Sequence, residues 1–106
     1  MFQFMLKNSV KSVDVNEMDK LIGKVELIDI REPYEYKAGH LPTAKNITMD
    51  TILKQPEKYL DKSKEYHIIC QSGSRSSRTC KILKEHGFNI VNVAGGTGRY
   101  IGKLER

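Results

Sequence analysis

The chain has 106 residues, 39% of them hydrophobic and 29% charged, and its formal net charge is +5. This length and composition fit one globular domain and exclude a disordered chain, so we expect a single domain over residues 1–106 with its core at about 13–104. Two cysteines are too few for a disulfide scaffold, and no apolar run reaches the length of a membrane span, so we expect a cytoplasmic protein that binds no membrane.

The first half of the chain alternates short apolar strands with short helices. Its apolar start, residues 1–6, is too short for the hydrophobic region of a secretion signal. Asp14 or Asn16 is positioned to cap the first helix, and Asp50 to cap the third. In chain order we expect a strand at 12–15, a helix at 17–22, a strand at 25–30, a helix at 32–37, a strand at 44–47 and a weak helix at 51–54.

The second half begins with a polar stretch, residues 55–64, that we expect to be irregular. It continues with a strand at 66–69, a helix at 74–86, a strand at 90–93 and a last helical segment that passes Ile101 and Leu104. Strands separated by helices imply right-handed crossovers. The predicted fold is therefore α/β, with a five-stranded, mostly parallel sheet and helices on both faces.

Chemistry in such a sheet lies beyond the carboxyl ends of the strands. Cys70 ends its predicted strand, Asp29 lies near the end of another, and Gly95 and Gly96 follow a third. The predicted fold would bring these residues together at one edge of the sheet.

The small polar loop after Cys70 makes this residue the candidate nucleophile. A thiol at a helix N-terminus faces free backbone N–H groups and the positive end of the helix dipole, and both favour the reactive thiolate. Successive N–H groups in the tight turn also form an anion cradle. The loop residues assigned to binding are Gln71, Ser72, Gly73, Ser74, Arg75 and Ser76.

The positive charge is concentrated in the last part of the chain. Residues 1–69 are neutral overall, and residues 70–106 hold seven basic and two acidic side chains. The excess either attracts a small anionic substrate to the cysteine loop or forms a solvated helix face, and the sequence leaves both interpretations open. We expect no nucleic-acid partner, because there is no compact basic run.

Several further residues have structural and functional interpretations. Cys80 is expected to face the core rather than to act as a resolving thiol. Asp29 and Arg31 are supporting residues: we expect Arg31 to pair with Glu35, and Asp29 to accept hydrogen bonds from the loop or from Arg75. We expect no metal site, because the histidines and cysteines show no ligand spacing.

Two motifs give the chain its resemblance to the single-domain rhodaneses, the thiosulfate sulfurtransferase family. The first is Asp29-Ile30-Arg31-Glu32-Pro33-x-Glu35-Tyr36, followed by Gly39-His40-Leu41-Pro42-x-Ala44-x-Asn46-Ile47. The second is Cys70-x-Ser72-Gly73-x-Arg75-Ser76, followed by Gly87-Phe88 and Val93-x-Gly95-Gly96. The resemblance covers roughly Val13 to Leu104 and implies a rhodanese-like fold.

The resemblance also implies a mechanism. Cys70 takes sulfane sulfur from a small anionic donor, thiosulfate or a low-molecular-weight persulfide, and holds it as a persulfide with no other cofactor. A thiol, cyanide or a protein then accepts it. Gln71 stands where many thiosulfate-using members have a basic residue, which favours a second hypothesis, a sulfur-relay or regulatory module loaded by a protein partner.

The length of the loop separates sulfur transfer from phosphate chemistry. Four residues stand between Cys70 and Arg75, whereas the related phosphatases and arsenate reductases have five. Those two activities are therefore the less favoured alternatives. The oligomeric state is left open by the sequence, and a monomer is compatible with it.

Overall fold

The computed structural model describes residues 9–106, so the expectation for residues 1–6 lies outside the described part. Its centre is a five-stranded sheet in the order β1-β5-β4-β2-β3, in which every neighbouring pair is parallel. This confirms the predicted α/β architecture. The strands are β1 (Lys11–Asp14), β2 (Glu26–Asp29), β3 (Lys45–Asn46), β4 (Glu65–Ile69) and β5 (Asn89–Ala94).

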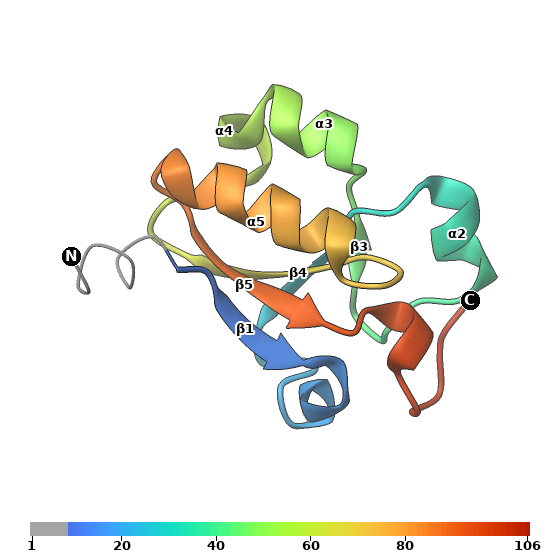
Figure 1. Ribbon diagram of the computed structural model, residues 1–106. Helices are drawn as coiled ribbons and strands as arrows, with labels where there is room; N and C mark the ends of the chain where they lie inside the picture. Colours follow the sequence, from blue (N-terminus) through green and yellow to red (C-terminus); the bar gives the residue numbers. More distant parts are fainter. Residues whose placement is uncertain (1–8) are drawn as a thin grey trace.

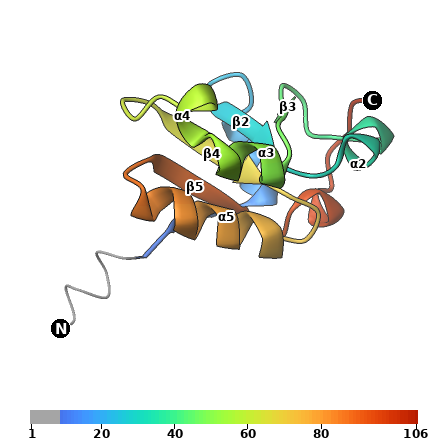
Figure 2. The ribbon, with the colours of Figure 1, turned by 90° about the horizontal axis from the view of Figure 1, so that it is seen from above.

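Helices cover both faces of the sheet. Figure 1 shows α3, α4 and α5 above the sheet and the 3-10 helix η1 below it. The view from above shows α3 and α5 side by side on the same face (Figure 2). The helical elements are η1 (Val15–Lys20), α2 (Pro33–Ala38), α3 (Met49–Lys54), α4 (Pro56–Tyr59), α5 (Ser74–Glu85) and η2 (Thr97–Arg99).

Two hydrophobic clusters, one on each face, stabilise this arrangement. The cluster under α3, α4 and α5 includes Ile30, Ile68, Leu83 and the cysteines Cys70 and Cys80, all of them buried. The cluster on the η1 face is built by the residues Val15, Met18, Leu27, Leu41, Ala44, Ile69 and Val93. The apolar strands are thus buried on both sides, as parallel sheets require.

The cap of the third helix differs from the prediction. The hydroxyl of Thr48 accepts the Thr51 N–H at 3.3 Å, so α3 starts at Met49, and Asp50 lies in its first turn. By contrast, Asp14 caps the first helix as predicted, by accepting the Asn16 N–H at 3.0 Å.

Two further expectations about helices were wrong. The stretch expected to be irregular contains α4, which begins at Pro56, a residue suited to the first turn because it lacks an N–H. The last predicted helix is only the short η2, since Gly98 and Gly102 disfavour a longer one. Beyond it the chain is extended, and the Glu105 N–H donates to the carbonyl of His40 at 2.8 Å.

The carboxyl ends of the strands meet the loop after β4, α2 and η2 at one end of the molecule (Figure 1). This is the edge predicted to carry the chemistry. In the part of the chain that the structure describes, no helix is both long and apolar enough to cross a bilayer.

Candidate active site

Cys70 lies between the end of β4 and the start of α5, with its side chain fully buried. The loop turns at Gly73, which has a φ of 102° and immediately precedes the helix. A Cβ at Gly73 would meet the Gly95 nitrogen at 3.3 Å, so both the conformation and the space favour glycine. The predicted thiol at a helix N-terminus is confirmed.

Backbone N–H groups of the loop point at the sulfur. Gly73 donates to Cys70 Sγ at 3.1 Å, and the Ser76 N–H donates to it at 3.3 Å. The thiol itself donates to Ser76 Oγ at 3.3 Å, and the Ser76 hydroxyl donates to the Gly73 carbonyl at 3.1 Å. The loop therefore surrounds the sulfur with hydrogen-bond donors.

These contacts shift the ionisation of Cys70. Burial alone raises the pKa of its thiol, but hydrogen bonds from Ser76, Gly73 and Ser72 outweigh burial, and the pKa lies below its ordinary value. Because the thiolate is the nucleophilic form, the loop makes Cys70 more reactive at neutral pH than an isolated cysteine.

Arg75 is held by an acidic partner on α2. Its two terminal nitrogens donate to the two carboxylate oxygens of Glu35, each at 2.9 Å. The bidentate contact lowers the pKa of Glu35 to about 2. The expectation that Glu35 pairs with Arg31 was therefore wrong, because Arg31 precedes α2 and is directed elsewhere.

Arg31 instead pairs with Asp29 inside the protein, where both side chains are almost fully buried. Arg31 Nη2 lies 2.7 Å from Asp29 Oδ2, and a second donor, Nε, lies 2.9 Å from Oδ1. The expectation that Asp29 accepts from Arg75 or from the loop was wrong, since Arg31 occupies the carboxylate. Arg31 Nη1 donates to Gln71 Oε1 at 3.0 Å, so this buried pair positions the loop side chain next to Cys70.

The turn after β5 supports the loop from the other side. The N–H of Thr97 donates to the carbonyl of Cys70, and the N–H of Gly98 donates to that of Gln71, both at 2.9 Å. A Cβ at Gly96 would lie 2.5 Å from the Gln71 oxygen and 2.6 Å from the Cys70 oxygen. The sequence predicted that this glycine turn lies at the site, but it gave no sign that the backbone beyond the turn binds the loop.

A sequence model described as the rhodanese-like domain matches residues 14–102. The chain belongs to this family. A protein of Bacillus subtilis (strain 168) named "Putative sulfurtransferase YtwF" is 48% identical over 79 residues, which are 74% of this chain and 76% of that protein. The thiosulfate:glutathione sulfurtransferase of Saccharomyces cerevisiae is 28% identical over 106 residues, covering 85% of this chain and 76% of the yeast protein.

A crystal structure of the protein SSP1007 from Staphylococcus saprophyticus has the same fold. It superposes with a TM-score of 0.82 at 32% identity, and the match covers 92% of this chain and 100% of that one. The family and its sulfurtransferase-named members support sulfur transfer as the general chemistry of this rhodanese-like domain.

Three other features of the sequence are explained by packing or by exposure to solvent: the second cysteine, the motif histidine and the basic residues of α5. Cys80 is fully buried in the core, as expected, and burial raises the pKa of its thiol to about 12. His40 stacks on Tyr36 with ring centroids 3.8 Å apart. Arg78 and Lys81 are exposed on α5, which fits the interpretation of the charge excess as a solvated helix face.

The serines of the loop divide into two kinds. Ser76 is buried against the sulfur, whereas Ser72 and Ser74 are exposed, with their hydroxyl oxygens 3.5 Å apart. Sequence alone could not separate them, because burial depends on where the helix packs.

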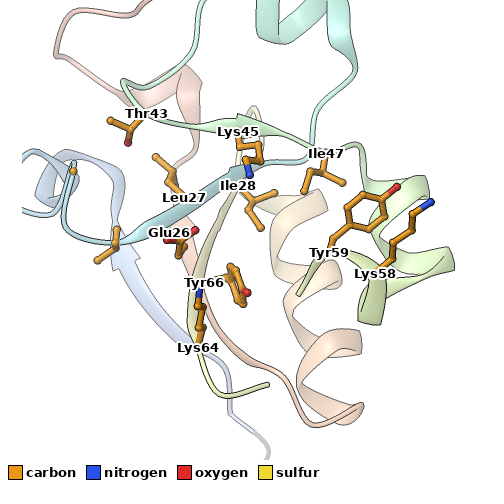
Figure 3. Close-up of a pocket in the computed structure, with 12 residues that line it drawn as sticks. Glu26, Leu27, Ile28, Thr43, Lys45, Ile47, Lys58, Tyr59, Lys64 and Tyr66 are labelled. Atoms are coloured by element: carbon orange, nitrogen blue, oxygen red, sulfur yellow. The ribbon is translucent and has the colours of Figure 1, made fainter. Parts of the chain in front are cut away.

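A separate cavity of about 750 Å³ lies near the first residues of β2 and β4 (Figure 3). Tyr66 and Ile28 form part of its wall, and Lys45, Lys58 and Lys64 are among its lining residues. No residue of the cysteine loop lines it, so among the described residues the nucleophile and this cavity are distinct features of the domain.

Proposed function

We propose that this protein is a sulfurtransferase that carries sulfane sulfur as a persulfide on Cys70. The observation that carries the proposal is the set of N–H groups aimed at Sγ, from Gly73 at 3.1 Å and Ser76 at 3.3 Å. Such donors favour an anionic sulfur, and the thiolate and the persulfide formed from it are both anions.

The reaction has two transfers. The Cys70 thiolate attacks the outer sulfur of thiosulfate or of a persulfide, a new S–S bond forms to Cys70, and sulfite or a thiolate leaves with the electron pair of the broken S–S bond. In the second transfer, a thiol or cyanide attacks the outer sulfur on Cys70, and the Cys70 thiolate is the leaving group. No external oxidant or reductant is needed.

The charges around the loop bear on the donor. Arg75 is neutralised by Glu35 and Arg31 by Asp29, and residue 71 is a neutral glutamine. A dianion such as thiosulfate therefore has no unpaired arginine among these residues, which supports a low-molecular-weight persulfide as the better donor.

Intact mass after incubation with each donor tests the proposal. We expect a gain of one sulfur atom that cyanide reverses, that is absent in Cys70→Ser, and that persists in the matched control Cys80→Ser. Loading by glutathione persulfide but not by thiosulfate supports the donor argued here. Loading only by a protein persulfide indicates the relay function instead, and loading that persists in Cys70→Ser overturns the mechanism.

A further inference from the structure

We propose that an apolar pocket beside Arg75 binds the carbon chain of the thiol that exchanges sulfur with Cys70, so that this site prefers apolar thiols. This proposal rests on the proposed function and adds its substrate class. The pocket has a volume of about 390 Å³, and Ile30, Met49 and Leu53 are its apolar lining residues. Pockets of roughly 300–1,000 Å³ are of the size that holds small ligands.

Backbone contacts connect the pocket to the nucleophile. The N–H of Ile30 donates to the carbonyl of Ile69, the residue before Cys70, at 3.0 Å. The carbonyl of Ile30 accepts the N–H of Met49 at 2.9 Å. Cys70 and Ile30 belong to one buried cluster, and Met49 and Leu53 pack against it. The pocket wall and the sulfur are therefore parts of one packed unit between β2, β4 and α3.

The charged residues at this pocket include one more carboxylate than cations. Arg75 is paired with Glu35 through two contacts, and Lys54 lies 3.2 Å from Asp50. One further carboxylate, that of Glu32, also lines the pocket. Because a carboxylate is in excess, an anionic chain is repelled here, whereas an apolar chain buries its surface against Met49 and Leu53.

The pocket takes part in the transfer of sulfur between Cys70 and the thiol. When the thiol R–SH accepts sulfur, its thiolate attacks the outer sulfur of the Cys70 persulfide, the Cys70 S–S bond breaks, and the Cys70 thiolate leaves. The products are R–S–SH and the free enzyme, and the proton of the original thiol ends on the product persulfide. The pocket holds R while this exchange occurs, in either direction.

A chain-length series tests the pocket. The protein is loaded with polysulfide, freed of excess reagent and discharged with ethanethiol, butanethiol or hexanethiol, and the loss of one sulfur is followed by intact mass. We expect the second-order rate constant to rise about threefold to fourfold for each methylene that becomes buried. A mercaptohexanoate of matched length should react more slowly than hexanethiol, because its carboxylate meets a pocket in which carboxylates outnumber cations.

Two variants locate the effect. Met49→Gln and Leu53→Asn keep the approximate size of the side chain and make it polar, so we expect both to flatten the series while discharge by cyanide is unchanged. Ile101→Asn is the matched control, because Ile101 is 87% exposed and lies outside the pocket, and it should keep the full dependence on chain length.

A separate experiment asks whether the carbon chain in the pocket belongs to a small thiol or to a cysteine peptide. The discharge rates of a leucylcysteine and a glycylcysteine peptide are compared. If leucylcysteine is faster by the same factor as hexanethiol is faster than ethanethiol, the pocket binds peptide thiols. If the two peptides discharge the protein at equal rates, the pocket binds small thiols. The pocket proposal is contradicted if the rate constant does not depend on alkanethiol length while cyanide still discharges the protein. It is also contradicted if both pocket variants keep the chain-length dependence of the wild type. Neither result contradicts sulfur transfer by Cys70. A protein that polysulfide cannot load contradicts the proposed function itself.

Discussion

The guanidinium of Arg75 is bound to Glu35, forty residues earlier, by two hydrogen bonds of 2.9 Å, although Arg75 belongs to the loop that surrounds the Cys70 sulfur. The sulfur is therefore stabilised by the N–H groups of Gly73 and Ser76 rather than by an unpaired cation. Because dipolar donors at short range are screened little by salt, we infer that the reactivity of Cys70 depends weakly on ionic strength.

Glu35→Gln should destabilise the fold at neutral pH and have little effect in acid. The pKa of Glu35 is held at about 2, below the ordinary 4.5. The stabilisation by its charge is therefore complete above pH 4.5 and is lost as the pH falls towards 2. We expect a loss of about 1 kcal/mol at pH 7, a value reduced because the pair is partly exposed to solvent.

Urea unfolding of both proteins at pH 7 and pH 2.5 measures this difference. If the difference in the free energy of unfolding between wild type and Glu35→Gln is the same at both pH values, the contact with Arg75 is not electrostatic.

Ser76→Ala should raise the pKa of Cys70. When the thiol ionises, the Ser76 hydroxyl becomes its donor and has to turn away from the Gly73 carbonyl, which it contacts at 3.1 Å in the structure. Losing a hydrogen bond to a charged group, worth roughly 1.5 kcal/mol, should slow alkylation of Cys70 at pH 7 about tenfold. Ser77→Ala is the control, because Ser77 is the exposed neighbour on α5. Equal alkylation profiles from pH 5 to 10 in both variants would contradict this role.

Gly96→Ala should disrupt both stability and the loop. The new Cβ would lie 2.5 Å from the Gln71 oxygen, at a residue whose φ of 65° is unfavourable for alanine. We expect a loss of about 3–5 kcal/mol, together with altered reactivity of Cys70. At Gly23 the φ is 84° and no atom lies within 4 Å of an added Cβ, so Gly23→Ala should cost only about 1–2 kcal/mol. Similar urea midpoints for the two variants would mean that the contact at Gly96 relaxes freely.

Arg31→Met should leave the Asp29 carboxylate buried without its partner. Breaking a buried ion pair from one side typically costs about 3–5 kcal/mol. The matched control is Lys20→Met, which removes the exposed pair with Glu17 and should change stability by less than about 0.5 kcal/mol. Because Arg31 also holds Gln71, its loss should free the loop side chain, which is measurable as an altered preference between thiosulfate and persulfide donors. A small cost in Arg31→Met, near that of the control, would contradict the role of this buried pair in stability.

The sequence predicted features that depend on local chemistry. The apolar strand before Cys70, the glycine at the turn and the helix after it are neighbours in the chain, and their order was sufficient to place the thiol. The partners of the arginines were mispredicted, because they depend on how distant elements pack. The predicted pair between Arg31 and Glu35 does not form, and Arg31 lies before α2 begins at Pro33.

The pocket beside Arg75 could not be found in this way either. Met49 and Leu53 belong to α3, which was predicted only for residues 51–54 with Asp50 as its cap. Only the packing of α3 against the face that holds Ile30 brings them to the site. Pro56, by contrast, is a local signal for the start of α4 that the prediction overlooked.

The bonds from Thr97 and Gly98 to the carbonyls of Cys70 and Gln71 have a consequence for biosynthesis. The cysteine is synthesised well before the turn that braces its loop, and β5 has to pair with β4 before that turn can reach it. A growing chain that ends at Ala94 thus contains the thiol without the brace. Its sulfur chemistry should mature only once the segment after β5 has left the ribosome and docked, so the reactive thiolate should form only when the fold is complete.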